Sequence, residues 1–192
     1  MRDVVGLAKK HGLALHLDGA RLFNAADGDA TAARALVDGF DTVSVCLPKG
    51  LGAPAGSVLC GSREAIAAGH RFRKMLGGGM RQAGILAAAG MYAIDNNIDR
   101  LCDDHANAKC LADGFADTPG SAWRHRNEMV FVDIPPAAID ALASHLDAQG
   151  IRATLYPRTR LVTHLEVDTA MVDATIAAFV DFFTAGKSPH DR

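Results

Sequence analysis

Residues 41–61, DTVSVCLPKGLGAPAGSVLCG, contain two short apolar runs with a single lysine between them. The runs TVSVCL (42–47) and GSVLCG (56–61) predict strands, because they are apolar, rich in β-branched residues and bounded by glycine and proline. Between them, Lys49 is surrounded by glycine, alanine and proline, which leave space around its amine. This arrangement predicts either a solvated loop charge or a lysine that contacts a large, flat ligand.

Helices and strands alternate on both sides of this stretch. On the N-terminal side, apolar residues at helical spacing predict a helix over 1–11 that stops at Gly12, and LALHL predicts a short strand over 13–17. On the C-terminal side, Ser62 is a typical helix N-cap, and the three glycines at 77–79 predict a mobile break in the helical pattern. The other expected helices are 22–40 with a break at Gly28, 62–76, 80–97 and 98–115.

A turn-rich segment over 117–127, which contains the only tryptophan, separates these elements from a second group. We therefore predict two domains, a partial large α/β domain over 1–116 and a small α/β domain over 117–192. The second group predicts a small sandwich, which is a sheet with helices on one face. Its expected strands are 129–134, 151–156 and 160–165, and its expected helices are 137–149 and 172–185.

The composition is that of a globular protein with a core, since 49% of the 192 residues are hydrophobic and 22% are charged. A formal net charge of -2 provides no basic field for nucleic acid, and no apolar run approaches the length of a membrane span. The N-terminal residues lack the unbroken apolar centre of a signal peptide. These features predict a soluble cytoplasmic protein without a nucleic-acid or membrane partner.

A metal site is considered because Cys102, His105 and Cys110 are close in sequence. Their spacing suits one stripe of a helix, and the sequence contains no CxxC or HExxH motif. The four cysteines are few for a chain of this length. We therefore expect reduced cysteines and no metal site.

Three stretches carry residues that share one chemistry, although each residue alone is more often a turn or surface residue. Asp18 follows a short apolar strand, at the strand end where ligands gather in parallel α/β sheets. Lys49 follows the next strand, and Lys74 and Arg81 flank the three glycines, where basic side chains suit a phosphate. Pyridoxal phosphate needs a lysine amine for a Schiff base and a carboxylate that keeps its ring nitrogen protonated. Together the three stretches predict a pyridoxal phosphate site.

The motifs LHLDGARL (15–22), SVCLPKGLGAPAGSVLCG (44–61) and LGGGMRQAGILAAAG (76–90) resemble those of the low-specificity L-threonine aldolases. Those enzymes belong to the threonine aldolase and β-eliminating lyase family of fold type I pyridoxal phosphate enzymes. RLVTHLEVD (160–168) resembles the closing strand of the family, and the motifs follow in the same order. The resemblance implies an α/β fold, the C-terminal part of a fold type I transferase-like enzyme.

For the cofactor, the resemblance implies that Lys49 forms the Schiff base and that Asp18 contacts the pyridinium nitrogen. Lys74 and Arg81 match basic residues beside the cofactor phosphate. Pro48 departs from the family, which usually has serine or threonine at this position. Because proline lacks a hydroxyl and a backbone N–H, we expect a weaker hold on the phosphate.

For the substrate, the resemblance implies that Arg21 and Arg160 bind the carboxylate of an amino acid, with Arg158 as a neighbour that makes the register ambiguous. The implied reaction cleaves L-threonine, L-allo-threonine and related β-hydroxy-α-amino acids to glycine and an aldehyde. No catalytic base is assigned, since His16 and His164 are interpreted as structural polar groups. The family also implies a homo-oligomer, a dimer or a tetramer.

Members of the family carry a further stretch before the first helix of this chain, with a phosphate-binding loop and a ring that stacks on the cofactor. The chain therefore resembles the C-terminal part of such an enzyme, for which we expect an exposed sheet edge and exposed apolar surface. Two alternatives to the aldolase stay open. One is a β-eliminating lyase or another fold type I activity, for which elimination releases an α-keto acid and ammonia, and the other is a non-catalytic fragment.

Overall fold

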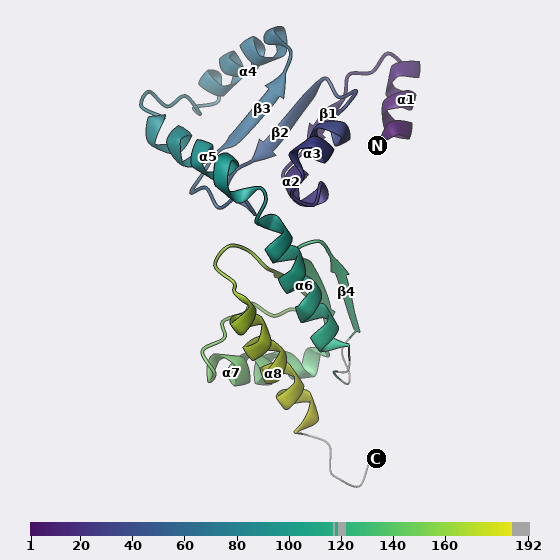
Figure 1. Ribbon diagram of the computed structural model, residues 1–192, viewed down its shortest axis with the longest axis vertical. Coiled ribbons are helices and arrows are strands. Elements are labelled where there is room, and N and C mark those ends of the chain that lie inside the picture. The colour runs from purple at the N-terminus through teal and green to yellow at the C-terminus, as the bar shows by residue number, and fades with distance from the viewer. Residues whose placement is uncertain (117, 119–121, 186–192) are drawn as a thin grey trace. The chain divides into compact units, whose positions relative to one another are not determined.

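The computed structural model describes residues 1–116, 118 and 122–185. The chain divides into two compact units, 1–102 and 103–192 (Figure 1). The division falls near the start of helix α6 (Leu101–Phe115), because Leu101 packs in the core of the first unit while Ala108 and later residues of the helix pack in the core of the second. The boundary predicted from the sequence lies at the far end of this helix, where the composition changes.

The first unit is built on a three-stranded sheet in which β1 runs parallel to β2 and β3 runs antiparallel to β2. The strands are β1 (His16–Asp18), β2 (Thr42–Cys46) and β3 (Ser57–Gly61). Asp18 lies opposite Ser44, so the carboxyl ends of both parallel strands meet at one edge of the sheet. The strands predicted over 42–47 and 56–61 are confirmed, whereas the one expected over 13–17 begins later.

The helices of the first unit are α1 (Arg2–Lys10), α2 (Leu22–Ala25), α3 (Ala30–Leu36), α4 (Arg63–Met75) and α5 (Gly84–Asn97). Two of them, α3 and α4, begin at side-chain N-caps that the sequence contains. The Ser62 hydroxyl accepts a hydrogen bond from the Ala65 N–H at 3.2 Å, which confirms the predicted start of α4. The Asp29 carboxylate accepts one from the Thr31 N–H at 2.7 Å and starts α3 just after the break predicted at Gly28.

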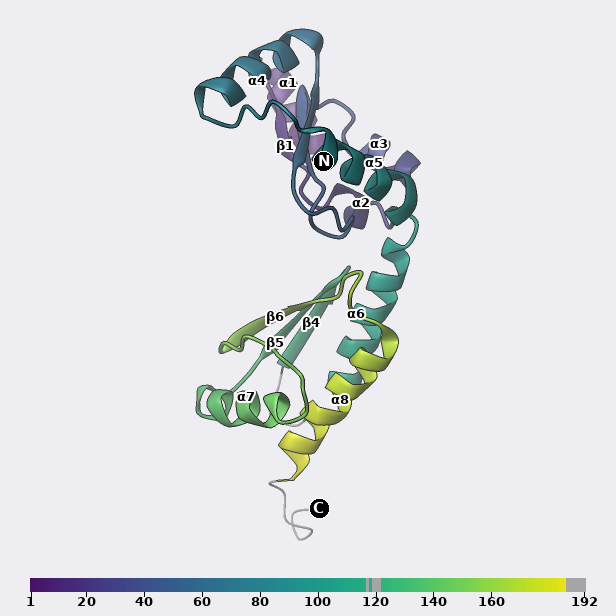
Figure 2. The ribbon, with the colours of Figure 1, turned by 90° about the vertical axis from the view of Figure 1, so that its left-hand side faces the viewer.

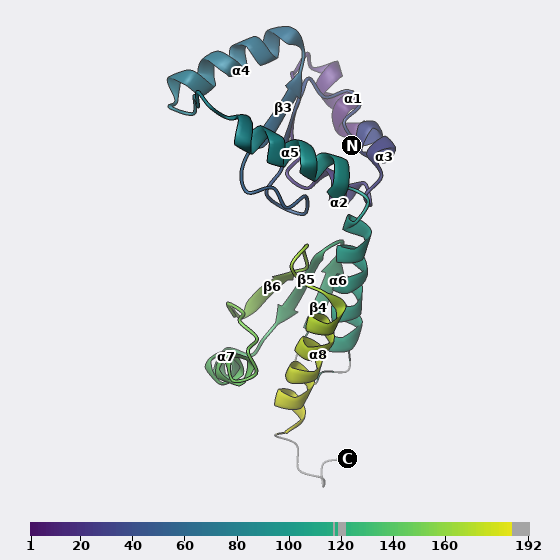
Figure 3. The same cartoon turned by 60° about the vertical axis from the view of Figure 1, so that its left-hand side comes forward.

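The connection between α4 and α5 (Figure 3) begins with a regular C-terminal cap of α4, which is formed by Gly77 and Gly78. Gly77 has a φ of 82°. The Gly78 N–H donates to the Arg73 carbonyl at 2.8 Å and the Gly77 N–H to the Lys74 carbonyl at 3.2 Å. This is the Schellman arrangement, in which glycine provides the left-handed residue. The break expected from the glycines is therefore a hydrogen-bonded turn.

We predict that Gly77→Ala lowers the free energy of unfolding by about 1 kcal/mol, because a Cβ is disfavoured at a positive φ. Urea denaturation followed by circular dichroism measures this difference. Gly84→Ala is the matched control, since a Cβ there would meet no atom within 4 Å, and its stability should be unchanged or slightly raised. Equal stability of Gly77→Ala and the wild type would contradict the role of the left-handed cap.

The second unit contains an antiparallel sheet in the order β4-β5-β6. Its strands are β4 (Ala122–Arg126), β5 (Met129–Asp133) and β6 (Arg158–Val162), and its helices are α6, the short η1 (Pro136–Ala138), α7 (Ile139–Asp147) and α8 (Thr169–Thr184). Helices α6 and α8 lie along one side of this sheet (Figure 2). Val130 and Val132 of β5 are buried in one core with Phe115 of α6, Leu142 of α7 and Phe179 of α8. The predicted sheet with helices on one face is thus confirmed.

Two details of the second unit differ from the sequence prediction. Residues 151–156, expected as a strand, have no strand structure; their apolar residues alternate because Ile151 and Leu155 pack against the core without pairing to a neighbouring strand. Strand β4 instead forms within the turn-rich segment 117–127, whose residues 117 and 119–121 lie outside the described part. The polar sequence of β4 has no alternating apolar pattern, and the strand is defined instead by its backbone pairing with β5.

The two units differ in how much apolar surface they bury. In the first unit, all five positions of β3 are exposed and α4 has no buried residue. Most of the large exposed apolar side chains lie here: Met1, Val4, Leu7, Leu13, Val58, Leu59, Phe72, Met75, Leu76, Met80, Ile85, Met91, Tyr92 and Ile94. This agrees with the expected apolar surface. Among the described residues, no helix is long and apolar enough to span a bilayer.

Candidate functional site

Asp18 and Lys49 lie at the same edge of the first sheet. Asp18 is the last residue of β1, and Lys49 follows Pro48 just beyond the end of β2. Because β1 and β2 are parallel, their carboxyl ends point the same way. The two residues that the sequence selects for cofactor chemistry therefore come from adjacent strand ends.

The backbone beside Asp18 is packed directly against β2. The Gly19 N–H donates to the Ser44 carbonyl at 2.8 Å, and a Cβ at Gly19 would lie 2.7 Å from that oxygen. Only glycine fits this close approach. The Asp18 carboxylate accepts a hydrogen bond from the Ala20 N–H at 3.0 Å while its side chain stays exposed. An exposed carboxylate on a fixed backbone is suited to meet a cationic ring nitrogen.

The loop that carries Lys49 is held by its own backbone. The Gly52 N–H donates to the Lys49 carbonyl at 2.8 Å, and the Ala53 N–H donates to the Leu47 carbonyl at 3.1 Å. Leu47, Leu51 and Ala53 are buried, whereas Lys49 is exposed. Within the described residues, the Lys49 amine has no hydrogen-bond or ion-pair partner. The loop therefore presents an unengaged amine on an anchored backbone.

Arg21 lies beside the same loop. It is half-buried and, with residues of α2, the end of β2 and Gly50, lines a hollow of about 190 Å³ including space open to solvent. A Cβ at Gly50 would lie 3.1 Å from the Asn24 side-chain oxygen and 2.7 Å from Leu101 Cδ2. Asn24 is buried, and sequence reasoning missed its contact with the lysine loop. The only signal was a polar residue inside an apolar helical run.

Lys74 and Arg81 lie on either side of the three glycines between α4 and α5, in the same unit as Asp18 and Lys49. Lys74 belongs to the last turn of α4, and its Cδ would be 2.8 Å from a Cβ at Gly79. Both cations are exposed, and neither has a hydrogen-bond or ion-pair partner among the described residues. Their charges are therefore available to an anion.

Arg160 lies in the second unit, on β6 opposite Phe131 of β5. It is exposed and unpaired within the described part of the chain. Arg158 instead donates to the two carboxylate oxygens of Asp133 at 2.7 and 3.1 Å. Of the two arginines that made the register ambiguous, Arg158 is engaged and Arg160 is available.

The Arg158–Asp133 pair gives a pH-dependent contribution to stability. The hydrogen bonds and charge of Arg158 hold the pKa of the Asp133 carboxyl below its ordinary value of 3.8. Because the folded-state pKa is lowered, this contribution is present above the unfolded pKa and is lost as the pH falls through the folded value. We expect the free energy of unfolding of Asp133→Asn to fall less than that of the wild type between about pH 5 and about pH 2. Arg158→Gln should show the same flattening, and an unchanged acid slope would contradict the pair.

His16, His164 and Cys102 make hydrogen-bond contacts. His16 Nδ1 lies 2.9 Å from the Thr42 hydroxyl across the parallel strands, and His164 Nδ1 accepts a hydrogen bond from the Glu166 N–H at 3.3 Å. The Cys102 thiol donates to the Asp99 carbonyl at 3.1 Å. Across residues 1–116, 118 and 122–185, no group of three or more potential metal ligands is found.

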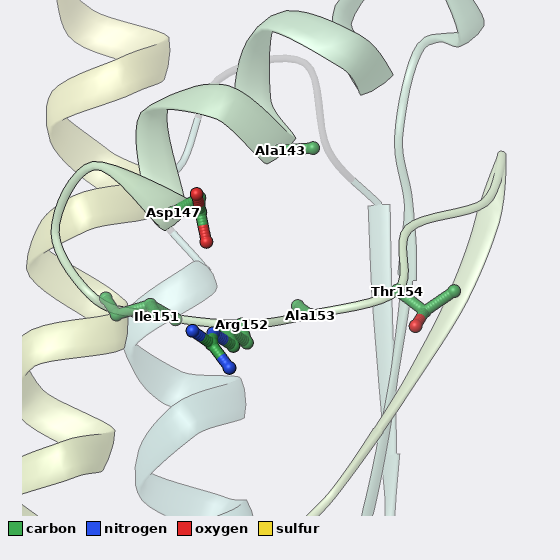
Figure 4. Close-up of a pocket in the computed structure, with 6 residues that line it drawn as sticks. All are labelled: Ala143, Asp147, Ile151, Arg152, Ala153 and Thr154. Atoms are coloured by element: carbon green, nitrogen blue, oxygen red, sulfur yellow. The ribbon is translucent and has the colours of Figure 1, made fainter.

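A groove in the second unit lies between α7 and residues 151–154 (Figure 4). Ala143, Asp147 and Arg152 are among its lining residues, and its volume is about 610 Å³ including space open to solvent. It contains none of the residues that the sequence selects, so we do not assign it to the cofactor site.

The chain resembles known proteins in sequence. Low specificity L-threonine aldolase of Escherichia coli O157:H7 is 41% identical over 185 residues, which cover 96% of this chain and 55% of that protein. Low-specificity L-threonine aldolase 1 of Arabidopsis thaliana is 40% identical over 191 residues, covering 95% of this chain and 53% of that protein. The chain therefore spans about half the length of the curated relatives it matches.

Solved structures share the fold at low sequence identity. A protein of Exiguobacterium sp. 255-15, provisionally described as an aromatic amino acid beta-eliminating lyase/threonine aldolase, superposes with a TM-score of 0.80 at 23% identity and covers 94% of this chain and 56% of its own. Alanine–glyoxylate aminotransferase of Nostoc sp. gives 0.64 at 20% identity, with 93% and 56% covered. At these identities the likeness concerns the fold alone.

The mixed α/β architecture is therefore part of the fold of the fold type I pyridoxal phosphate enzymes, which confirms the predicted fold class. The sequence match is more specific. The profile of the beta-eliminating lyase family covers residues 1–135, and the chain belongs to this family.

Proposed function

We propose that the chain is the lysine-bearing part of a pyridoxal phosphate-dependent aldolase that cleaves L-threonine, L-allo-threonine and related β-hydroxy-α-amino acids to glycine and an aldehyde. The observation that carries this proposal is the position of Asp18 and Lys49 at the carboxyl ends of two adjacent parallel strands, in a chain 41% identical to a named L-threonine aldolase. Neither feature alone selects the reaction, since sheet edges bind many ligands.

The residues present fit the cofactor. The exposed Asp18 carboxylate would hold the ring nitrogen, and the unengaged amine of Lys49 would anchor the aldehyde carbon. Small residues around Lys49 leave room for a ring, and Lys74 and Arg81 would neutralise the phosphate. When bound, pyridoxal phosphate supplies the electron sink for the carbanion that bond cleavage leaves behind.

For the substrate, we propose that Arg21 and Arg160 bind the carboxylate. A planar guanidinium suits a carboxylate because it donates two parallel hydrogen bonds. A carboxylate fixed in this way orients the Cα–Cβ bond, which is the bond to be cleaved. The availability of Arg160, compared with the engaged Arg158, supports this choice.

A β-eliminating lyase is the second candidate, because the family that matches residues 1–135 carries that description. Elimination would use the same lysine and carboxylate but release an α-keto acid and ammonia. The non-catalytic alternative draws on the half-length match and on the exposed apolar surface of the first unit. The same surface supports association, and we propose a homo-oligomer for the active form.

Product analysis distinguishes these functions. The purified protein is incubated with pyridoxal phosphate and L-threonine or L-allo-threonine, and glycine, acetaldehyde, α-keto acid and ammonia are quantified. Equal amounts of glycine and acetaldehyde are expected. An α-keto acid with ammonia would replace the aldolase by the lyase, and absence of any product would favour the non-catalytic alternative.

A further inference from the structure

The open face of the sheet in the second unit carries a cluster of arginines. Val130 and Val132 of β5 point into the core, so the alternating residues of this strand lie on the opposite face. Residues paired across an antiparallel ladder share a face. The pairings therefore place Arg124 and Arg126 of β4, Met129, Phe131 and Asp133 of β5, and Arg158 and Arg160 of β6 together. We call this surface the arginine face.

The arginine face has the opposite charge to the unit that contains it. Residues 103–192 contain eight lysines and arginines and thirteen aspartates and glutamates. Four of those eight cations lie on this one face, with Asp133 as the single acid in the paired strands. This separation of charge creates a positive potential at the arginine face, although the unit as a whole has a negative net charge.

One arginine of the face, Arg158, forms an ion pair with Asp133, and the charge of Arg124 also helps to lower the pKa of that carboxyl. Arg158 donates to Asp133 at 2.7 and 3.1 Å. Among the residues that the structure describes, Arg124, Arg126 and Arg160 have no hydrogen-bond or ion-pair partner, and all three are exposed. Three like charges near one another repel, and an anion would relieve that repulsion.

The register of the sheet makes this face suited to a ligand with more than one anionic group. Arg124 and Arg160 are both paired with Phe131, one on each side. With neighbouring strands about 5 Å apart, their backbones are separated by roughly 10 Å, a span that two long side chains can bridge around one small ligand. The half-buried Phe131 ring provides the apolar floor between them.

We propose that the arginine face binds a small multivalent oxyanion, with carboxylate or phosphate groups, through Arg124, Arg126 and Arg160. Guanidinium forks match either group in a bidentate manner. The Asp133–Arg158 pair lies beside the site, and the carboxylate of Asp133 reduces the positive charge of the arginine face. The proposed oxyanion site shares Arg160 with the substrate site proposed above, whereas Arg124 and Arg126 belong to it alone.

The test is titration of the purified full chain with pyrophosphate and with citrate, at constant ionic strength and without pyridoxal phosphate or substrate. Isothermal titration calorimetry reports binding. Either anion should bind at least tenfold more tightly than acetate. The tighter of the two identifies the preferred group. Binding of both no tighter than acetate would overturn the proposal.

Variants locate the site. Arg124→Gln and Arg126→Gln should each weaken binding roughly fivefold, as expected for an exposed charged contact. Asp133→Asn should strengthen binding several-fold, because it removes the acid and releases Arg158; a general loss of structure would not produce this gain. Arg152→Gln is the matched control, since Arg152 is an exposed arginine of the same unit that lines the α7 groove. Equal weakening in Arg152→Gln, or no change in Arg124→Gln, would overturn the assignment.

The test of oxyanion binding can fail or succeed independently of the test of the proposed aldolase activity. Oxyanion binding is measured without cofactor, and Arg124 and Arg126 have no part in the proposed aldolase chemistry. Loss of product formation with intact oxyanion binding would reject only the aldolase. Product formation with no oxyanion binding would reject only the arginine face.

Discussion

Replacing Lys49 with alanine is expected to abolish retention of pyridoxal phosphate after dialysis and to lower product formation at least about 10³-fold. The amine is exposed, has no partner among the described residues and is carried by a loop whose backbone is fixed by Gly52 and Ala53. Removing it leaves those backbone hydrogen bonds intact, so the fold should persist. Absorption spectroscopy of the dialysed protein and the glycine assay measure the two effects.

Two controls make the Lys49 result specific. Lys49→Arg keeps the positive charge but cannot form the covalent link, so it should resemble Lys49→Ala if chemistry rather than charge is lost. Lys10→Ala changes an exposed lysine in the last turn of α1 and should retain the cofactor like the wild type. Retention of the cofactor by Lys49→Ala would show that another group holds it.

Replacing Asp18 with asparagine is expected to weaken cofactor retention roughly 10- to 100-fold, the range of one charge-assisted hydrogen bond. Product formation should fall on the order of 10²- to 10³-fold, because an electrostatic partner of the reacting system is lost. In the wild type the Asp18 carboxylate accepts a hydrogen bond from the Ala20 N–H at 3.0 Å. The side-chain oxygen of asparagine can still accept this hydrogen bond. The change therefore removes the charge and preserves the turn.

The matched control for Asp18→Asn lies at the other end of the same strands. The Asp41 carboxylate accepts a hydrogen bond from the Leu15 N–H at 2.7 Å, just before β1 and β2 begin. Asp41→Asn should leave retention and product formation unchanged. Equal losses in the two variants would indicate a general effect on the sheet rather than a contact of Asp18 with the ring.

Much of the first unit could be predicted because its helix caps and apolar runs mark helices and strands that the structure contains. Ser62 starts α4 through its hydroxyl, and the lysine loop is bounded by two apolar runs that pair as β2 and β3. The shared edge of Asp18 and Lys49 follows from strand order alone once β1 and β2 are parallel. The contact of Asn24 with the loop could not be predicted, because it depends on how α2 packs.

In the second unit, the apolar pattern of the sequence did not identify every strand, because backbone pairing between strands determines which residues form the sheet. Residues 151–156 alternate like a strand because alternate side chains pack on the core, whereas β4 has polar residues that carry no apolar pattern. The arginine face depends on β4 and its register with β5. The arginine face could therefore not be predicted from the sequence, although the sequence contains Arg124 and Arg126, because strand β4 was not predicted.

The central claim is that Lys49 anchors pyridoxal phosphate. The direct measurement is incubation of the chain with the cofactor, borohydride reduction, and peptide mapping by mass spectrometry at cofactor concentrations equal to that of the protein. We predict a phosphopyridoxyl group on Lys49, with exposed lysines such as Lys9 and Lys10 unmodified. Modification spread over several surface lysines, or none on Lys49, would contradict the account.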